Sequence, residues 1–260
     1  MASGGFFRQV RILLLLLVLF AVAMNAWLTK MRTTSWDKSL WMVVYPVNGD
    51  GRPATQRYID GLSADDFSAI GTFLADQAQR YSVGISEPLN LRLAAQVKDR
   101  PPMPPRGAGT LSIMMWSLKL RYWAYTHDEY GGPSPDVRMY VVYHDPQESS
   151  RLQHSLGIQK GLIGVVNAFA SRNMTQSNNV VIAHEFLHTV GASDKYDPAS
   201  NRPLYPQGYA EPRRQPLYPQ RFAEIMGGRI PLSQERSVMP ETLSQSVIGE
   251  QTAIEIRWLR

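Results

Sequence analysis

The chain has 260 residues, of which 44% are hydrophobic and 19% are charged, which is typical of a globular protein and argues against intrinsic disorder. About 220 residues follow an apolar N-terminal segment, so the length allows one domain with a substantial core and little room for a second. The net charge of +5 is spread along the chain without dense Lys/Arg blocks, and this argues against a nucleic-acid partner; cysteine is absent, which excludes disulfides.

The N-terminus contains an apolar run, residues 12–28, that is flanked on both sides by basic residues. Roughly 17 residues at about 1.5 Å each just reach across a hydrocarbon core. We therefore expect a cytoplasmic stretch at 1–9, a single-pass transmembrane signal anchor at 10–28 and a linker at 29–39, with the following domain outside the cytoplasm. A signal peptide cleaved near Ala21-Val22-Ala23, which would give a secreted protein, is the alternative.

The remaining chain predicts alternating strands and helices. Short apolar runs rich in β-branched and aromatic residues predict strands at 40–47, 89–97, 137–143 and 162–170. Helical spacing predicts helices at 63–81, capped by Ser63, at 111–125 after a proline-rich break, from about 177, and at 241–258. This order is compatible with one α+β domain over residues 40–260.

The most informative stretch is HEFLH at 184–188, followed by Gly191 and Asp194. Residues four apart lie on one face of a helix, so His184 and His188 can direct two imidazoles at one metal ion, with Glu185 beside them. The surrounding helix is apolar nearly all round, where two His and a Glu would be costly without a partner such as a metal. Gly191 suits a left-handed cap, and Asp194 follows closely enough to be a third ligand that leaves a fourth position open. The alternative is a buried helix with incidental histidines.

The run HEFLHTVGASD resembles the HExxHxxGxxH/D signature of the metzincin clan of zinc metallopeptidases, in the variant with Asp as third ligand found in snapalysin-like enzymes. The resemblance extends to EIMGG at 224–228, where the clan has its Met-turn, and implies that Met226 supports the site by packing and is not a ligand. It covers about residues 177–228, and no Tyr closely follows Met226 as in some members. The implied fold is zincin/metzincin-like, with a twisted mixed sheet, an active-site helix, a Met-turn and a C-terminal helix.

The predicted activity is that of a zinc metalloendopeptidase with one Zn²⁺ per chain and a peptide or protein substrate. Zinc held by His184, His188 and Asp194 would activate a water, and Glu185 would take its proton and pass it to the leaving amine. Tyr196 is a candidate for contacting substrate or stabilising an oxyanion. Two other functions stay open, a zinc hydrolase of cell-wall peptides and a non-catalytic, zinc-stabilised module that binds peptides.

Other residues compete for roles at the metal. Asp197 is an alternative third ligand, although Asp194 matches the clan spacing. Glu211 or Glu224 would take that role in a thermolysin-like enzyme, but a distant ligand would not need the sharp stop at Gly191. The remaining histidines share no ligand spacing and are expected to be exposed or hydrogen-bonded: His127, His144 and His154.

Two further segments lie near the motif in sequence. The stretch PLYPQGYAE at 203–211 recurs as PLYPQRFAE at 216–224, and we expect a proline-stiffened loop below the metal, with a rim or lid beside the cleft as the alternative. The resemblance implies that strand 162–170 is a sheet edge lining the cleft. Small residues at Gly161, Gly164 and Ala168 would then let an extended substrate pair with it, and an interior strand is the alternative.

Overall fold

The computed structural model describes residues 7–17, 19–20, 24, 34–105, 107, 109–148, 155–158 and 162–259. The chain divides into two compact units, Met1–Ser35 and Trp36–Arg260. The second unit starts ahead of the predicted boundary at residue 40, because Trp36 is buried, donates from its indole Nε1 to Ile256 O at 2.7 Å and packs edge-on against Trp258.

The predicted membrane anchor is contradicted. No helix among the described residues is both long and apolar enough to cross a membrane. The prediction of a single-pass membrane protein is therefore wrong. The alternative cleavage site at 21–23 lies outside the described residues.

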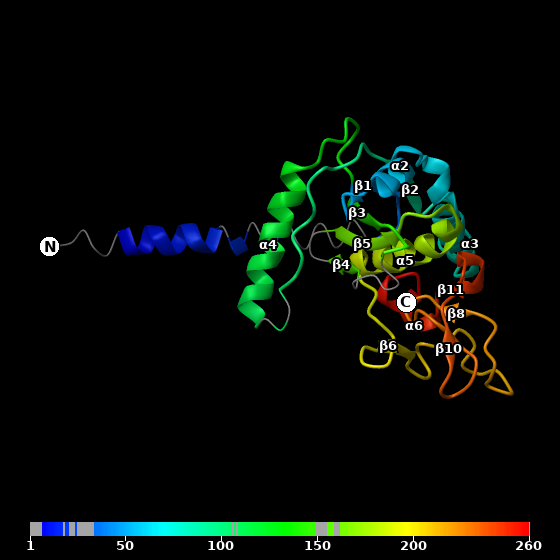
Figure 1. The fold of residues 1–260 in the computed structure, drawn as a ribbon. Coiled ribbons are helices and arrows are strands. Elements are labelled where there is room, and N and C mark those ends of the chain that lie inside the picture. The colour runs from blue at the N-terminus through cyan, green and yellow to red at the C-terminus, as the bar shows by residue number, and fades with distance from the viewer. Residues whose placement is uncertain are drawn as a thin grey trace. The chain divides into compact units, whose positions relative to one another are not determined.

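The second unit is built on a five-stranded sheet of order β2-β1-β3-β5-β4 (Figure 1). Its strands are β1 (Leu40–Asn48), β2 (Leu89–Leu93), β3 (Val137–His144), β4 (Leu156–Ile158) and β5 (Ile163–Phe169). The first three and β5 run parallel, and β4 pairs antiparallel with β5. The four predicted strands are present, and the mixed α/β architecture is compatible with the predicted α+β class.

Successive side chains of the central strands enter two hydrophobic cores, one on each face of the sheet. Met42 and Val44 of β1 lie in the first core, which also contains residues of helix α5 (Thr175–Thr189), whereas Val43 and Tyr45 lie in the second core. Tyr45 stacks on Tyr140 of β3 with ring centroids 4.9 Å apart. Burial on both faces explains why these strands are nearly continuous apolar runs in the sequence.

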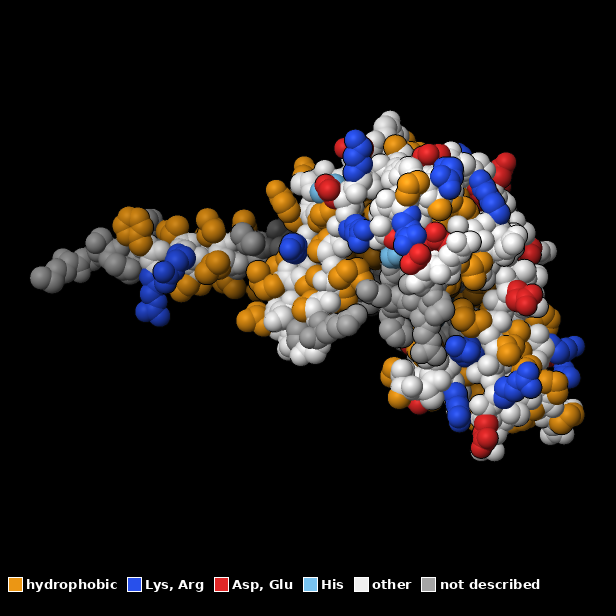
Figure 2. All heavy atoms as spheres, in the orientation of Figure 1, with side chains coloured by type: hydrophobic (Ala, Val, Ile, Leu, Met, Phe, Trp, Pro, Cys, Tyr) orange, Lys and Arg blue, Asp and Glu red, His pale blue; other side chains and the backbone are white. Residues whose placement is uncertain are grey.

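Helices cover both faces of the sheet (Figure 1). The first core is covered by α2 (Pro53–Asp60), α3 (Ser68–Arg80) and α5 (Thr175–Thr189). The second is covered by α4 (Thr110–Thr126), through Leu120 and Ala124. Ser63 is the N-cap, as predicted, in a capping box in which the Asp66 carboxylate accepts from Ser63 N at 2.8 Å, although the first turn, Ala64–Phe67, is a 3-10 helix. The outer face of α4 is apolar and exposed (Figure 2) and includes Leu111, Met114, Met115, Leu118, Tyr122 and Tyr125.

The strand β5 does not form the edge of the sheet, so the expectation of a substrate-lining edge at 162–170 is wrong. It lies between β3, which pairs with all of it, and β4, which pairs with its first three residues, 163–165. Gly164 is required by packing inside the sheet, because a Cβ there would meet Met139 Sδ at 2.2 Å. Ala168 is buried in the first core, and Gly161 lies outside the described residues. The edge is the short β4, whose three residues are too few for a recognisable periodic pattern.

Beyond α5 the chain runs through short 3-10 and strand segments to a final helix. A 3-10 turn, Arg172–Met174, precedes α5. The later strands are β6 (Tyr196–Asp197), β7 (Arg202–Pro203), β8 (Ala223–Glu224), β9 (Ile230–Pro231), β10 (Ser237–Val238) and β11 (Ser246–Val247). The final helix is α6 (Glu250–Glu255), so the prediction of a helix over 241–258 is wrong in its first half. There a 3-10 turn, Leu243–Gln245, leads into β11, whose pairing with β8 overrides local helical spacing, and Gly249 caps the helix.

Candidate metal centre

Helix α5 places His184 and His188 on successive turns of one face. Their rings lie 4.8 Å apart between centroids and are nearly perpendicular. His184 Nδ1 donates to Ile225 O at 2.9 Å, and His188 Nδ1 donates to Ala192 O at 2.8 Å. A carbonyl oxygen only accepts, so both bonds assign the ring proton to Nδ1 and leave Nε2 as the atom that can bind a metal.

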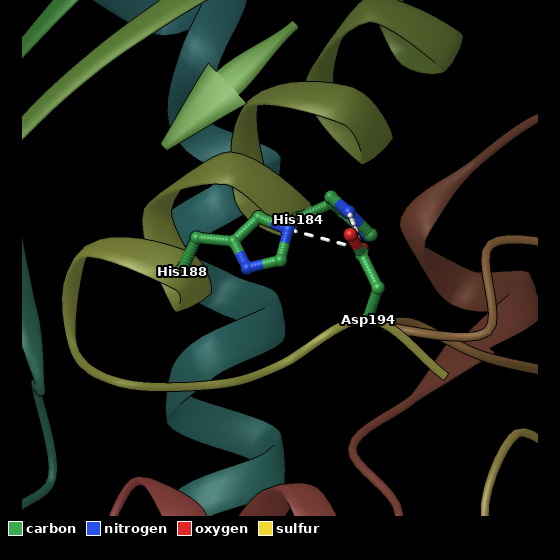
Figure 3. A group of neighbouring side chains, drawn as sticks. All are labelled: His184, His188 and Asp194. Carbon is green, nitrogen blue, oxygen red and sulfur yellow. Dashed lines mark ion pairs between the residues drawn. The ribbon is translucent and has the colours of Figure 1, made fainter. Parts of the chain in front are cut away.

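Asp194 reaches the two imidazoles from the loop that follows α5 (Figure 3). Its Oδ1 lies 3.2 Å from His184 Nε2 and 3.1 Å from His188 Nε2. Partial burial would raise the pKa of Asp194, but the two histidines that face its carboxylate outweigh this and lower the pKa below its usual range. The ligand atoms of the three residues all lie within 4.8 Å of one another, so the group can hold a metal ion.

The turn between the histidines and Asp194 depends on Gly191. Its φ of +115° is a conformation that L side chains rarely adopt, which confirms the left-handed role expected of this residue. Gly191 N donates to His188 O, and Ala192 N donates to Leu187 O at 3.0 Å. Because Ala192 O accepts the proton of His188 Nδ1, the turn that ends the helix also orients a candidate ligand.

A hydrogen-bonded cluster that the sequence did not predict surrounds Asp194. Lys195 is only 3% exposed, and its Nζ donates to Glu255 Oε2 at 2.8 Å and to Ser193 O at 2.9 Å. Ser193 donates to the same carboxylate from its backbone N at 2.9 Å and from its Oγ at 2.7 Å. Glu255 lies in α6, so no local sequence pattern links it to the ligand loop.

The turn at 224–228 lies directly beside the histidines. Met226 is fully buried in the first core, as expected of a packing residue. Ile225 O orients His184, and Met226 O accepts from Lys195 N at 2.9 Å. The turn therefore contacts both the metal helix and the Asp194 loop.

Glu224 anchors this turn and is also fully buried. Its carboxylate accepts from Gly227 N at 2.8 Å, Gly249 N at 3.0 Å and Thr252 Oγ1 at 2.7 Å. Burial raises the pKa of Glu224 against the opposing effect of these donors and of Lys195. The Glu224 carboxylate thus joins the turn to the start of α6. Its oxygens are engaged by these donors and do not belong to the candidate metal group.

The structure also brings Glu185 and Tyr196 to the centre. Glu185 follows His184 on α5 and is 5% exposed. The Tyr196 ring centroid lies 6.3 Å from that of His184. Burial, together with the negative charges of Asp194 and Glu185, raises the pKa of Tyr196 to about 12, so its hydroxyl stays protonated at neutral pH.

The competing acidic residues have other partners. Asp197 accepts from Ala199 N at 3.0 Å and from Ser200 Oγ at 2.7 Å, as in a local turn. Glu211 forms an ion pair with Arg221, whose Nε donates at 2.8 Å. Neither belongs to the described group of ligand atoms.

Two of the three remaining histidines are hydrogen-bonded, as expected. His127 pairs with Asp99 at 3.0 Å and stacks on Trp123. His144 Nε2 lies 3.1 Å from Asn167 Oδ1. His154 lies outside the described residues.

The repeated proline segments pack against each other and against the ligand loop. The hydroxyls of Tyr209 and Tyr218, one from each copy, lie 2.9 Å apart. Leu204 N donates to Lys195 O at 2.8 Å, which ties the first copy to the residue after Asp194. These contacts favour the interpretation as a supporting loop.

Searches of protein-family models and of curated proteins found no match for this chain. The resemblance of HEFLHTVGASD to the metzincin signature therefore stays a prediction, and the function is inferred from the geometry of the site.

Proposed function

We propose that this protein is a zinc-dependent metallopeptidase in which His184, His188 and Asp194 hold the metal. The observation that carries the proposal is the convergence of three ligand atoms within 4.8 Å beside the buried Glu185. Two imidazole nitrogens and one carboxylate oxygen fit zinc, and three protein ligands leave a position for water or substrate. The carbonyl partners of both Nδ1 atoms support this assignment, since metal-binding histidines commonly donate their second nitrogen in this way.

Zinc, when bound, lowers the pKa of a coordinated water and polarises a substrate carbonyl. Glu185 follows a candidate ligand directly in sequence and is buried beside it on α5. We propose that its carboxylate accepts the proton of the attacking water and returns it to the leaving amine. Tyr196 keeps its proton at neutral pH and can donate a hydrogen bond to the oxyanion that develops on the substrate.

The arrangement around the site supports a metzincin-like interpretation. A sheet precedes the metal helix, and the buried Met226 turn and a C-terminal helix follow it. The antiparallel β4 is at the end of the sheet and takes the place that we had expected for β5. An extended substrate can add to such an edge by main-chain pairing, which gives affinity with little side-chain selectivity.

The test compares wild type with Glu185→Gln in the full chain, using a broad peptide library, casein and purified peptidoglycan. We expect Glu185→Gln to keep its zinc, because Glu185 is not a ligand, and to lose about 10²- to 10⁴-fold in hydrolysis. Asp197→Asn is a matched control, since Asp197 is an acid near the site whose partners are local. Near-full activity of Glu185→Gln would contradict the mechanism.

The choice of substrate separates the alternative functions. Cleavage of peptidoglycan without cleavage of casein would favour a cell-wall hydrolase. Zinc-loaded wild type that cleaves none of the three substrates would favour a peptide-binding module and overturn the proposed peptidase.

A further inference from the structure

We propose that Glu255 is a positioning residue for the third metal ligand: through Ser193 and Lys195 it fixes the backbone on both sides of Asp194 and so presets the site for zinc. The inference rests on the metal site of the proposed function. It assigns to α6 a role in metal affinity in addition to its place in the core.

The geometry places one carboxylate against both neighbours of the ligand. Glu255 Oε1 accepts from Ser193 Oγ at 2.7 Å, and Oε2 accepts from Ser193 N at 2.9 Å and from Lys195 Nζ at 2.8 Å. Lys195 Nζ also donates to Ser193 O at 2.9 Å, which closes a ring of bonds around Asp194. With both of its neighbours held in this way, the ligand has little freedom to leave the histidines.

These bonds are strengthened by burial, which reduces screening by solvent. The side chain of Lys195 is 3% exposed and that of Glu255 is 21% exposed, so solvent screens this pair little. Burial would raise the pKa of Glu255, but the bonds from Lys195 and Ser193 lower it, so the carboxylate stays ionised. A buried ion pair often adds little net stability, because desolvation of the two charges offsets their attraction. The Lys195–Glu255 pair therefore fits a role in fixing one geometry of an irregular loop.

The same helix also fixes the other half of the site. At the start of α6, Gly249 N and Thr252 Oγ1 hold Glu224, and Glu224 belongs to the turn whose Ile225 carbonyl orients His184. At the end of α6, Glu255 holds the Asp194 loop. The loop that supplies one ligand and the turn that orients another therefore share a single support, which limits their relative movement.

The predicted effect is on zinc affinity. If Asp194 is preset, the ordering of its loop precedes metal binding; without Glu255, metal binding must order the loop and affinity falls. Loss of partners of metal ligands typically weakens affinity by about 10- to 100-fold. We expect Glu255→Ala to raise the zinc Kd of the full chain by about this factor, and Glu255→Gln, which keeps an acceptor for Ser193, to raise it less. The Kd is measured by competition with a chromogenic chelator.

A matched control separates positioning from general destabilisation. Asp128 and Arg138 form a comparable pair, with side chains 17% and 22% exposed, and Asp128 also binds Tyr45, whose side chain lies in the second core. Asp128→Ala should lower the melting temperature and leave the zinc Kd unchanged within about twofold.

A double variant covers the case in which Glu255→Ala fails to fold. Lys195→Met with Glu255→Met replaces the pair by apolar side chains, an exchange that is often neutral for stability. It should fold, by circular dichroism, and still bind zinc more weakly than wild type. Wild-type zinc affinity in a folded Glu255→Ala or double variant would overturn the positioning role alone. Failure of wild type itself to bind zinc would instead overturn the proposed function, and this inference with it.

Discussion

Replacement of Glu224 tests how much the support beneath the metal centre contributes to the fold. Glu224→Ala leaves Gly227 N, Gly249 N and Thr252 Oγ1 without the acceptor that now lies 2.7 to 3.0 Å away. Each bond to a charged group contributes about 1.5–3 kcal/mol, and the cost of burying the carboxylate offsets part of their sum. We expect a net loss of about 3–5 kcal/mol in the free energy of unfolding, as for other broken buried polar networks.

The assay is urea unfolding of the full chain, followed by circular dichroism at neutral pH with a chelator present, so that metal binding does not contribute. A loss of this size corresponds to roughly 10 °C in melting temperature for a unit of this length. Glu250→Ala is the control, since Glu250 is an exposed acid in the first turn of the same helix and should change stability by less than about 0.5 kcal/mol. A loss below about 1 kcal/mol for Glu224→Ala would refute the reasoning.

Three further predictions concern the loop packing, the acid stability and the proposed role of the Tyr196 hydroxyl. Gly208→Ala would place a Cβ 2.2 Å from Lys195 O and 2.7 Å from Leu204 N, so the loops must shift. We expect a loss of about 1–3 kcal/mol in the free energy of unfolding from thermal melts, against no measurable loss for Gly84→Ala, where space is open. Equal melting of both variants would contradict this. Burial would raise the pKa of Asp128, but bonds from Tyr45 and Arg138 lower it, so the stability that Asp128 contributes is present above its ordinary pKa and lost as pH falls through the folded pKa. Asp128→Asn should therefore flatten the acid side of a curve of unfolding free energy against pH, measured by urea unfolding. An unchanged acid slope would exclude this. Tyr196→Phe should lower kcat by about 10²-fold with bound zinc unchanged, and an unaltered kcat would remove Tyr196 from the mechanism.

Local sequence patterns predict the elements that depend on local interactions or that are buried on every side. The strands β1, β3 and β5 are buried on both faces, so their apolar runs were visible without knowledge of their partners. The helix α2 was not predicted, although Pro53 at its start is a common helix-opening residue. The segment β11 was read as helix because its strand pairing with β8 is a contact between distant residues.

The candidate metal ligands were predictable because they fall within eleven consecutive residues, 184–194. The i, i+4 spacing of His184 and His188, the glycine stop and Asp194 all follow from helix geometry and one turn. Their supports were not predictable. The Glu255 contacts with Ser193 and Lys195 span about 60 residues of sequence, and only the folded chain brings these side chains together.

The most direct test of the metal centre is the amount of zinc bound per chain after dialysis. We expect about one zinc ion per chain in wild type, sharply less in Asp194→Ala, and the wild-type amount in Asp197→Ala and Glu211→Ala, whose side chains have other partners. Wild type without zinc, or loss of zinc in Glu211→Ala with retention in Asp194→Ala, would contradict the site built from His184, His188 and Asp194.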